Sequence, residues 1–580
     1  MRPSSPSRES KLDTCDGLGA SHSRIAWARF LRQPWAWALV LLTLGLVGGA
    51  VAASVSMVKP FYPTLHDEYS NLLAADTLLQ GRLANPTPKS WEPLQTFHVI
   101  FKPSYASKYP LAPGLFIALG YLVFGVPLAG SWIAAGLAAS SGAWMVAGVT
   151  SRRWATFGGL LIALHPAMQT TWSYSLAGGW ATAAFAMLVL GAVFRLRRRF
   201  EKANALVLGV GIAGLALCRP FEGFVFAFVA CALLLGLQAK RTAPSKRFNW
   251  SHIMNQDTLR TACFAGIPVS AALFCIAMQN RATTGSILRM PYQVHEQQYG
   301  VAPLFVFGEE KVPASIADET APDVVRNYHQ GWSLESYESR AGLAGWGKGF
   351  FFGLGLIASY WGIGVGLIGF IGCALGARYS LGRGVLAMLL IQMAVSSSVC
   401  WVYPHYLAPI TACLLVGVVC CVQQCVQSLG ALWLQRGLRP SHLASLLIAF
   451  QVGGLLWALF ALSRSEHDAW ARRRAEVAAS LRKTDGKDLV LVHYEASHNV
   501  HQEWVYNAAN LPQSEIIWAR AERPEWRDLL LQDYGSERYV WELHVGGNLG
   551  EDVELSLVSK PILTRVSEFT SPGNRWSCFD

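Results

Sequence analysis

The residues best suited to chemistry lie in a polar segment, Thr64 to Pro113, which separates two apolar runs. Asp67 and Glu68 form an acidic pair near the start of this segment, soon after the first apolar run ends. A carboxylate at such a boundary is partly withdrawn from water, which suits a general base. The alternative roles for the pair are an interface anchor or a helix cap.

A second polar cluster ends the same segment, with Tyr105, Ser107, Lys108 and Tyr109 directly before the next apolar run. An ammonium group at this position is suited to binding an anionic leaving group such as a lipid phosphate. The alternative is a lysine that extends from apolar surroundings to the membrane interface.

Two ionisable residues, Arg219 and Glu222, lie at an abrupt junction between apolar runs, in the sequence CRPFEG. Ionisable groups next to a membrane are costly and are often functional. A mutual ion pair that closes the turn is the alternative. His165, on an apolar stretch, is expected to be a hydrogen-bonded core residue.

Two later segments offer further polar groups. His295, Glu296 and Tyr299 belong to the sequence HEQQYG, in a long polar region whose folding over the site would add them to it. His405 and Tyr406 fall at the outer end of an expected helix, where they would contact donor phosphate or sugar. The alternatives are surface loop positions for the first group and an aromatic-belt position for the second.

The composition indicates a protein of the membrane. The chain has 580 residues, of which 52% are hydrophobic and only 15% charged, against about a quarter charged in soluble proteins. The net charge of +11 comes from basic clusters that flank apolar runs, which is the positive-inside pattern and disfavours nucleic-acid binding. The 12 cysteines include no CxxC pair, so neither a disulfide framework nor a zinc site is indicated.

These candidates require a helical membrane scaffold. Segments of about 20 residues suffice to span a bilayer, and the expected spans number about eleven: 35–58, 128–149, 155–173, 178–194, 203–218, 220–238, 261–279, 349–375, 383–401, 405–425 and 441–462. Alternating directions then place the basic clusters and the N-terminus in the cytoplasm and the C-terminus outside. A signal peptide ending at Ala50-Val51-Ala52 is disfavoured by its long charged leader.

The remaining segments complete the expected organisation. Residues 1–33 form a disordered cytoplasmic tail, 34–463 the transmembrane module with external loops at about 59–127 and 280–348, and 464–580 a small extracytoplasmic α/β domain. In that domain, strands are expected at 488–494, 515–520 and 537–545, and a helix at 525–534. The run 111–125 is expected to lie along the outer membrane surface.

Several blocks together resemble the GT-C glycosyltransferases. They read HDEYSNLLAADTLLQGRLANPT, PSYASKYP, TGSILRMPYQVHEQQYG, HY-x-x-P (His405, Tyr406, Pro409) and VHYEASHNVHQEWVYNAANL. The chain is most similar to the bacterial RgtA/B/C/D-like, family-39 group, which is related to protein O-mannosyltransferases and the lipid A aminoarabinose transferase. The resemblance implies a mainly α, polytopic helical bundle with amphipathic helices in its first external loop.

The resemblance also implies an activity, namely inverting transfer of a sugar from a polyprenyl-phosphate donor to an acceptor hydroxyl outside the cytoplasmic membrane of a bacterium. Asp67, with Glu68 beside it, would act as general base or orient the acceptor hydroxyl, and Lys108 would contact the lipid phosphate. The acceptor would be an envelope glycan, a lipid or a protein. No cofactor is expected, although the resemblance does not exclude a divalent metal ion. The second external loop carries Ser173, Tyr174 and Ser175 but no carboxylate, which departs from the family's frequent second acid.

Two other function classes compete with this hypothesis. A multi-pass transporter or flippase of amphipathic substrates should carry charged or broken helices at mid-membrane, whereas the polar groups here gather at one face. A non-catalytic membrane scaffold would leave the first loop's acid and lysine without a role.

Overall fold

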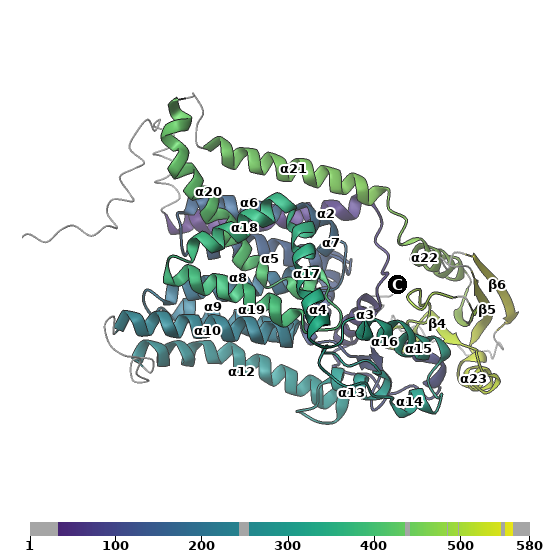
Figure 1. The fold of residues 1–580 in the computed structure, drawn as a ribbon. Coiled ribbons are helices and arrows are strands. Elements are labelled where there is room, and N and C mark those ends of the chain that lie inside the picture. Colours follow the sequence, from purple (N-terminus) through teal and green to yellow (C-terminus); the bar gives the residue numbers. More distant parts are fainter. Residues whose placement is uncertain are drawn as a thin grey trace, which may run out of the picture.

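The computed structural model describes residues 33–242, 255–435, 441–483, 485–496, 498–546 and 552–560. Residues 1–32 of the expected cytoplasmic tail lie outside these ranges. A helical bundle forms one end of the molecule and a small sheet the other, with the first polar segment between them (Figure 1).

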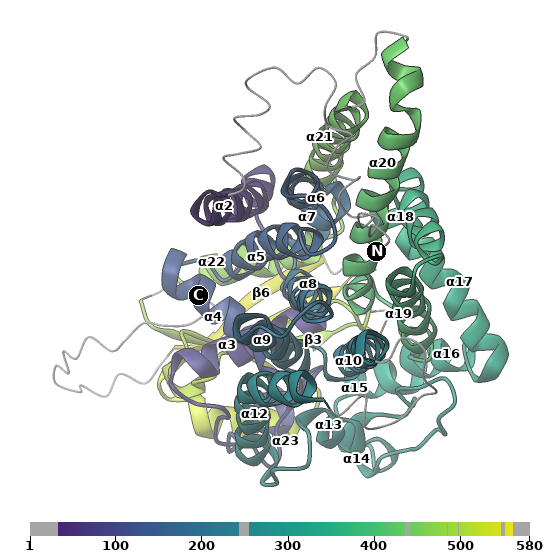
Figure 2. The same ribbon diagram turned by 90° about the vertical axis from the view of Figure 1, so that its left-hand side faces the viewer.

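The bundle is built from apolar helices packed around α8. They are α2 (Pro34–Val58), α5 (Ala129–Val146), α6 (Arg152–Ala163), α7 (Pro166–Trp172), α8 (Gly179–Leu196), α9 (Lys202–Cys218), α10 (Pro220–Thr242), α12 (Gln256–Thr284), α17 (Gly342–Trp361), α18 (Ile363–Gly376), α19 (Ser380–Ser396), α20 (Ile410–Gln435) and α21 (Ser441–Ser463). Helix α8 lies in the middle, with α5 and α9 on either side (Figure 2). Its many alanines and glycines let neighbouring helices approach closely.

Within the described residues, six helices are long and apolar enough to cross a membrane, or up to eight if two bent pairs each count as one span. The predicted number of eleven is therefore not confirmed. The run 155–173 is not one helix, because it breaks at His165, where Pro166 cannot donate a backbone hydrogen bond. The run 349–375 also breaks, at Gly362, which adopts φ +70° between α17 and α18.

The first polar segment folds into α3 (His66–Leu79), η1 (Glu92–Leu94), the strand pair β1 (Val99–Ile100) and β2 (Ala106–Ser107), and α4 (Leu111–Phe124). Helix α4 makes an angle of 106° with α5 and is not a continuation of it. Its exposed side chains are apolar, among them Leu115, Leu122 and Phe124. These features suit the predicted position along the membrane surface, which remains a prediction.

The long polar region after α12 forms α13 (Pro291–Tyr299), α14 (Ala314–Ala317), α15 (Asp323–Asn327), the π-helical turn η2 (Tyr328–Trp332) and α16 (Ser333–Glu338). A short 3₁₀ turn, η3 (Pro404–Leu407), precedes α20. His295 on α13 is 1% exposed, so its alternative as a surface loop residue is wrong.

The C-terminal region contains α22 (Ala469–Leu481), β3 (Lys487–Tyr494), η4 (Leu511–Gln513), β4 (Ile516–Arg520), α23 (Pro524–Leu530), η5 (Leu531–Gly535), β5 (Arg538–Gly546) and β6 (Asp552–Ser559). The strand order is β4-β3-β5-β6, with β3 parallel to β4 and β5, and β6 antiparallel to β5. The three expected strands and the helix between them are confirmed; β6 was not expected. One face of the sheet, with Val490 and Val492 of β3, shares a core with Tyr69 and Leu72 of α3.

Candidate active site

Asp67 lies in the first turn of α3, where two side chains from the end of the same loop reach it. The Tyr109 hydroxyl donates a hydrogen bond of 2.5 Å to Oδ1, and Nε2 of His98 lies 3.3 Å from the same oxygen. The Asp67 side chain remains 20% exposed. The carboxylate is thus held in position while staying accessible to a ligand.

Glu68 has a different environment from its neighbour. Its Oε2 accepts hydrogen bonds from the backbone N–H groups of Thr64 and Leu65, at 2.9 and 3.2 Å, and its Oε1 accepts one from Leu176, at 3.1 Å. The residue is 2% exposed, and burial raises its pKa against the lowering effect of these bonds. Glu68 therefore caps α3, as the cap alternative predicted, and joins it to the loop between α7 and α8.

Lys108 is 5% exposed and points toward α13. Its Nζ lies 3.8 Å from Oε1 of Glu296 and 4.7 Å from the ring centre of Tyr292. Burial lowers the pKa of Lys108, while the Glu296 and Asp67 carboxylates act to raise it. The ammonium group is thus within electrostatic reach of Asp67.

Arg219 contributes a second cation from the junction of α9 and α10. Its guanidinium lies over the Tyr406 ring, 4.3 Å from the centroid. Among the described residues, Arg219 and Glu222 form no ion pair within 4.0 Å, so the predicted ion pair across the turn is wrong. Burial acts to lower the pKa of Arg219, but Tyr406, Glu222 and Asp67 raise it more, so the guanidinium keeps its charge.

His405 lies beside this cation and completes the η3 side of the site. Its ring stacks on Tyr403 with centroids 5.7 Å apart, and its buried Nε2 has no hydrogen-bond partner among the described residues. Burial lowers the pKa of His405 well below its usual value, and Arg219 adds to this effect. A neutral imidazole therefore faces the region around Arg219.

A series of histidine rings runs inward from Asp67, and sequence reasoning missed most of it. The centroids of His98 and His295 are 5.8 Å apart, those of His98 and His66 5.8 Å, and those of His66 and His501 5.7 Å. His329 adjoins His295 at 6.0 Å. Burial is the main cause that lowers the pKa of every ring in the series, so the Asp67 carboxylate borders neutral imidazoles.

Two predicted site residues, Tyr105 and Tyr299, are anchored by their hydroxyl groups, and the Tyr299 ring also contacts the histidine series, 5.3 Å from the ring of His295. The Tyr105 hydroxyl donates to the backbone carbonyl of Asn507 at 2.9 Å, and the Tyr299 hydroxyl donates to Oε1 of Gln95 at 2.8 Å. Both tyrosines are 3% exposed. Their hydroxyl groups join the external loops to one another and to the C-terminal region.

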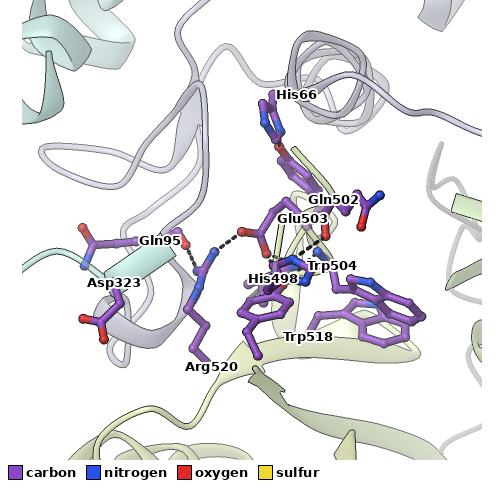
Figure 3. Close-up of polar contacts among 12 residues, drawn as sticks. His66, Gln95, Asp323, His498, Gln502, Glu503, Trp504, Trp518 and Arg520 are labelled. Carbon is purple, nitrogen blue, oxygen red and sulfur yellow. Dashed lines mark hydrogen bonds and ion pairs between the residues drawn. The ribbon is translucent and has the colours of Figure 1, made fainter. Parts of the chain in front are cut away.

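A buried ion pair holds the C-terminal region against the first loop. Figure 3 shows Arg520 of β4 between the backbone carbonyl of Gln95 and the carboxylate of Glu503. Both charged side chains are 0% exposed. Glu503 also accepts hydrogen bonds from the Tyr494 hydroxyl, at 2.6 Å, and from the Val505 N–H, at 2.7 Å. The segment that carries Asp67 is therefore packed against the sheet.

Comparison with solved structures identifies the fold of this chain. No family model and no curated protein matches the sequence. The structure of ArnT from Cupriavidus metallidurans bound to undecaprenyl phosphate is similar, with a TM-score of 0.51 over 88% of this chain and 94% of that one at 11% identity. The chain has the GT-C glycosyltransferase fold.

Two further structures with this fold are more distant from the chain. Apo ArnT from Cupriavidus metallidurans gives a TM-score of 0.48 at 11% identity, over 88% of this chain and 92% of that one. The Archaeoglobus fulgidus oligosaccharyltransferase gives 0.48 at 12% identity, over 86% and 67%. The predicted recognition of the GT-C fold and the predicted mainly helical architecture are confirmed.

The loops of this chain thus bring two partly exposed carboxylates, Asp67 and Glu296, together with two cations, Lys108 and Arg219. Around Asp67, the described residues bring no three His, Cys, Asp or Glu ligand atoms within 4.8 Å of one another. The chemistry that this arrangement supports is proton acceptance by Asp67 next to an anion site at Lys108 and Arg219, and no step of it is assigned to a metal.

Proposed function

We propose that the protein is a membrane glycosyltransferase that transfers a sugar from a polyprenyl-phosphate donor to an acceptor hydroxyl, with inversion, at the outer face of a bacterial cytoplasmic membrane. The observation that carries this proposal is the accessible Asp67 carboxylate within electrostatic reach of Lys108 and Arg219. Such a transfer requires a carboxylate that accepts a proton and, next to it, cations that bind the phosphate.

In the proposed reaction, Asp67 accepts the proton of the acceptor hydroxyl as its oxygen attacks the anomeric carbon of the donor. The bond between that carbon and the phosphate oxygen breaks on the opposite side, and polyprenyl phosphate leaves with the electron pair. A positioned carboxylate contributes about 10²–10⁴-fold to such a step. The Tyr109 hydroxyl fixes the Asp67 oxygen that it contacts, so the other oxygen is free for the acceptor.

The leaving group is polyprenyl phosphate, which departs as a stable anion. It therefore needs positive charge nearby and does not need a proton. Lys108 and Arg219 supply this charge from two separate elements, the first loop and the α9–α10 junction. The ArnT structure of the same fold was determined with undecaprenyl phosphate, which supports a lipid-linked donor. The acceptor is proposed to be an envelope glycan, a lipid or a protein.

The test is transfer by membranes that contain the protein. Membranes are incubated with a panel of radiolabelled polyprenyl-phosphate sugars, and labelled products are identified by mass. We expect one donor to yield product with the wild-type chain and none to do so with Asp67→Asn. Failure of every donor, with the folded protein present, would overturn the proposal and favour the transport of amphipathic substrates.

A further inference from the structure

Three side chains with metal-ligand chemistry gather in the C-terminal sheet, away from Asp67. His493 is the penultimate residue of β3, and Glu542 and His544 lie on β5. The two strands are parallel neighbours, and His493 is in register with His544. Glu542 precedes His544 by two positions, which places both on the same face of the sheet. Strand pairing thus brings the three groups together.

The geometry of the three groups suits one metal ion. One ligand atom from each residue lies within 4.8 Å of the other two. The imidazole rings of His493 and His544 stack with centroids 4.7 Å apart and planes at 12°. Zinc binds imidazole nitrogen and carboxylate oxygen at about 2.0–2.2 Å, so its ligand atoms are about 3.4 Å apart in a tetrahedral site. Small side-chain rotations would bring the ligand atoms from within 4.8 Å of one another to this shorter separation.

The surroundings leave the ligand atoms available. The Nε2 atom of His493 is buried and has no hydrogen-bond partner among the residues that the structure describes. His544 is exposed, so an ion can enter from solvent.

Arg527 of α23 forms an ion pair with one oxygen of the Glu542 carboxylate. Its Nη2 lies 2.9 Å from Oε1 of Glu542, so one carboxylate oxygen remains for a metal while the other is oriented by the guanidinium. Such outer contacts commonly fix a metal ligand in place. Glu554 of β6 is in register with His544 and therefore shares its face of the sheet.

We propose that His493, Glu542 and His544 form a site for a first-row divalent cation, with Zn²⁺ the best fit. Two imidazoles and one carboxylate are a common zinc ligand set. Water or Glu554 fills the fourth position. The ion links the carboxyl ends of β3 and β5 and so stabilises the sheet that packs against the first external loop. This inference does not depend on the proposed sugar transfer.

The test uses the full-length protein in detergent, purified without a histidine tag and stripped of metal by a chelator. Co²⁺ is titrated in, and the visible d–d absorption of a tetrahedral nitrogen–oxygen site is recorded. Thermal unfolding is then measured with and without Zn²⁺. We expect the wild-type band to saturate at about one ion per chain and Zn²⁺ to raise the Tm.

The variants His544→Asn and His493→Gln should lose the saturable band and the Zn²⁺ shift in Tm. Because His544 is exposed, its replacement leaves the core of the sheet intact. His467→Asn is the control, since His467 is an exposed histidine between α21 and α22 and should bind metal as the wild type does. A wild-type protein without the band, or a His544→Asn variant that keeps the wild-type band, overturns the proposal.

Discussion

The hydroxyl of Tyr109 donates a 2.5 Å hydrogen bond to Oδ1 of Asp67 across 42 residues of chain. This contact closes the first polar segment on itself, because Asp67 lies in the first turn of α3 and Tyr109 directly precedes the turn into α4. Lys108 is the neighbour of Tyr109 in sequence. The proposed base and the proposed phosphate ligand are therefore positioned by one closed segment.

The first prediction concerns Asp67. Asp67→Asn should lower the transfer rate by about 10²–10⁴-fold, because an amide cannot accept the acceptor proton. The amide still has an oxygen for the Tyr109 hydroxyl, so the variant should insert and unfold as the wild type does. Initial rates with labelled donor, alongside thermal unfolding of the purified protein, test both statements.

The matched control for Asp67 is its neighbour, Glu68→Gln. Glu68 accepts three backbone N–H groups with its two oxygens, and an amide nitrogen cannot accept any of them. We expect a loss of stability of about 1–3 kcal/mol with turnover of the folded fraction largely kept. Full activity of Asp67→Asn at wild-type protein levels would exclude Asp67 as the base.

The second prediction separates donor binding from turnover. Lys108→Met keeps most of the side-chain volume but removes the charge that faces Glu296 and Asp67. The KM for the donor should rise about tenfold or more, since a charged hydrogen bond contributes about 1.5–3 kcal/mol, whereas kcat at saturating donor should fall less. Lys102→Met is the control, because Lys102 is exposed and stacks on Trp91 in the same loop. An unchanged donor KM in Lys108→Met would remove Lys108 from the donor site.

The third prediction concerns pH. Burial lowers the pKa of Lys108 below its ordinary value, so the free enzyme loses this charge at a lower pH than an exposed lysine does. The kcat/KM for the donor reports groups of the free enzyme and should therefore fall on the alkaline side below pH 10.5. In Lys108→Arg the charge persists, and the decline should move to higher pH. An identical alkaline limb in both proteins would contradict this assignment.

Apolar runs and alternating strands could be recognised from the sequence because each depends on local pattern. The spans around α2, α8, α12 and α21 and the strands β3, β4 and β5 were predicted in this way. The helix breaks were harder to predict. Pro166 interrupts a run that is apolar on its N-terminal side, and Gly362 ends α17 at φ +70° within a run that stays apolar on both sides.

The candidate site was only partly predictable, because its contacts join distant parts of the chain. Asp67, Lys108 and Arg219 stood out as charges beside apolar runs. His98 did not, although it contacts Asp67, since a single histidine carries no spacing signal. The buried position of the Glu68 side chain depends on a hydrogen bond from the Leu176 N–H, which lies 108 residues away in the sequence. Charge and hydropathy thus indicate candidate residues, and tertiary packing decides which of two adjacent acids stays accessible.

The last prediction addresses the contact between the sheet and the first loop. Arg520 and Glu503 are both 0% exposed, and Arg520 also donates to the backbone carbonyl of Gln95. Arg520→Met would leave the Glu503 carboxylate buried without its partner, a change that costs about 3–5 kcal/mol. The segment that carries Asp67 would then lose its contact with β4.

We therefore expect Arg520→Met to lower the Tm, to expose the first loop to limited proteolysis near Gln95 and to reduce transfer through loss of the ordered site. Arg473→Ala is the control, because Arg473 and Glu476 form an exposed pair at 3.0 Å that contributes at most about 1 kcal/mol. Replacing both partners, Arg520→Met with Glu503→Leu, should restore part of the lost stability, since the fully buried carboxylate is then removed together with its cation. Glu522, 3.7 Å from Nε of Arg520, loses a partner in both variants but is 18% exposed. A double variant as unstable as Arg520→Met would mean that the hydrogen bonds of these two residues, from Arg520 to Gln95 and from Tyr494 and Val505 to Glu503, hold the sheet against the loop, and not the ion pair.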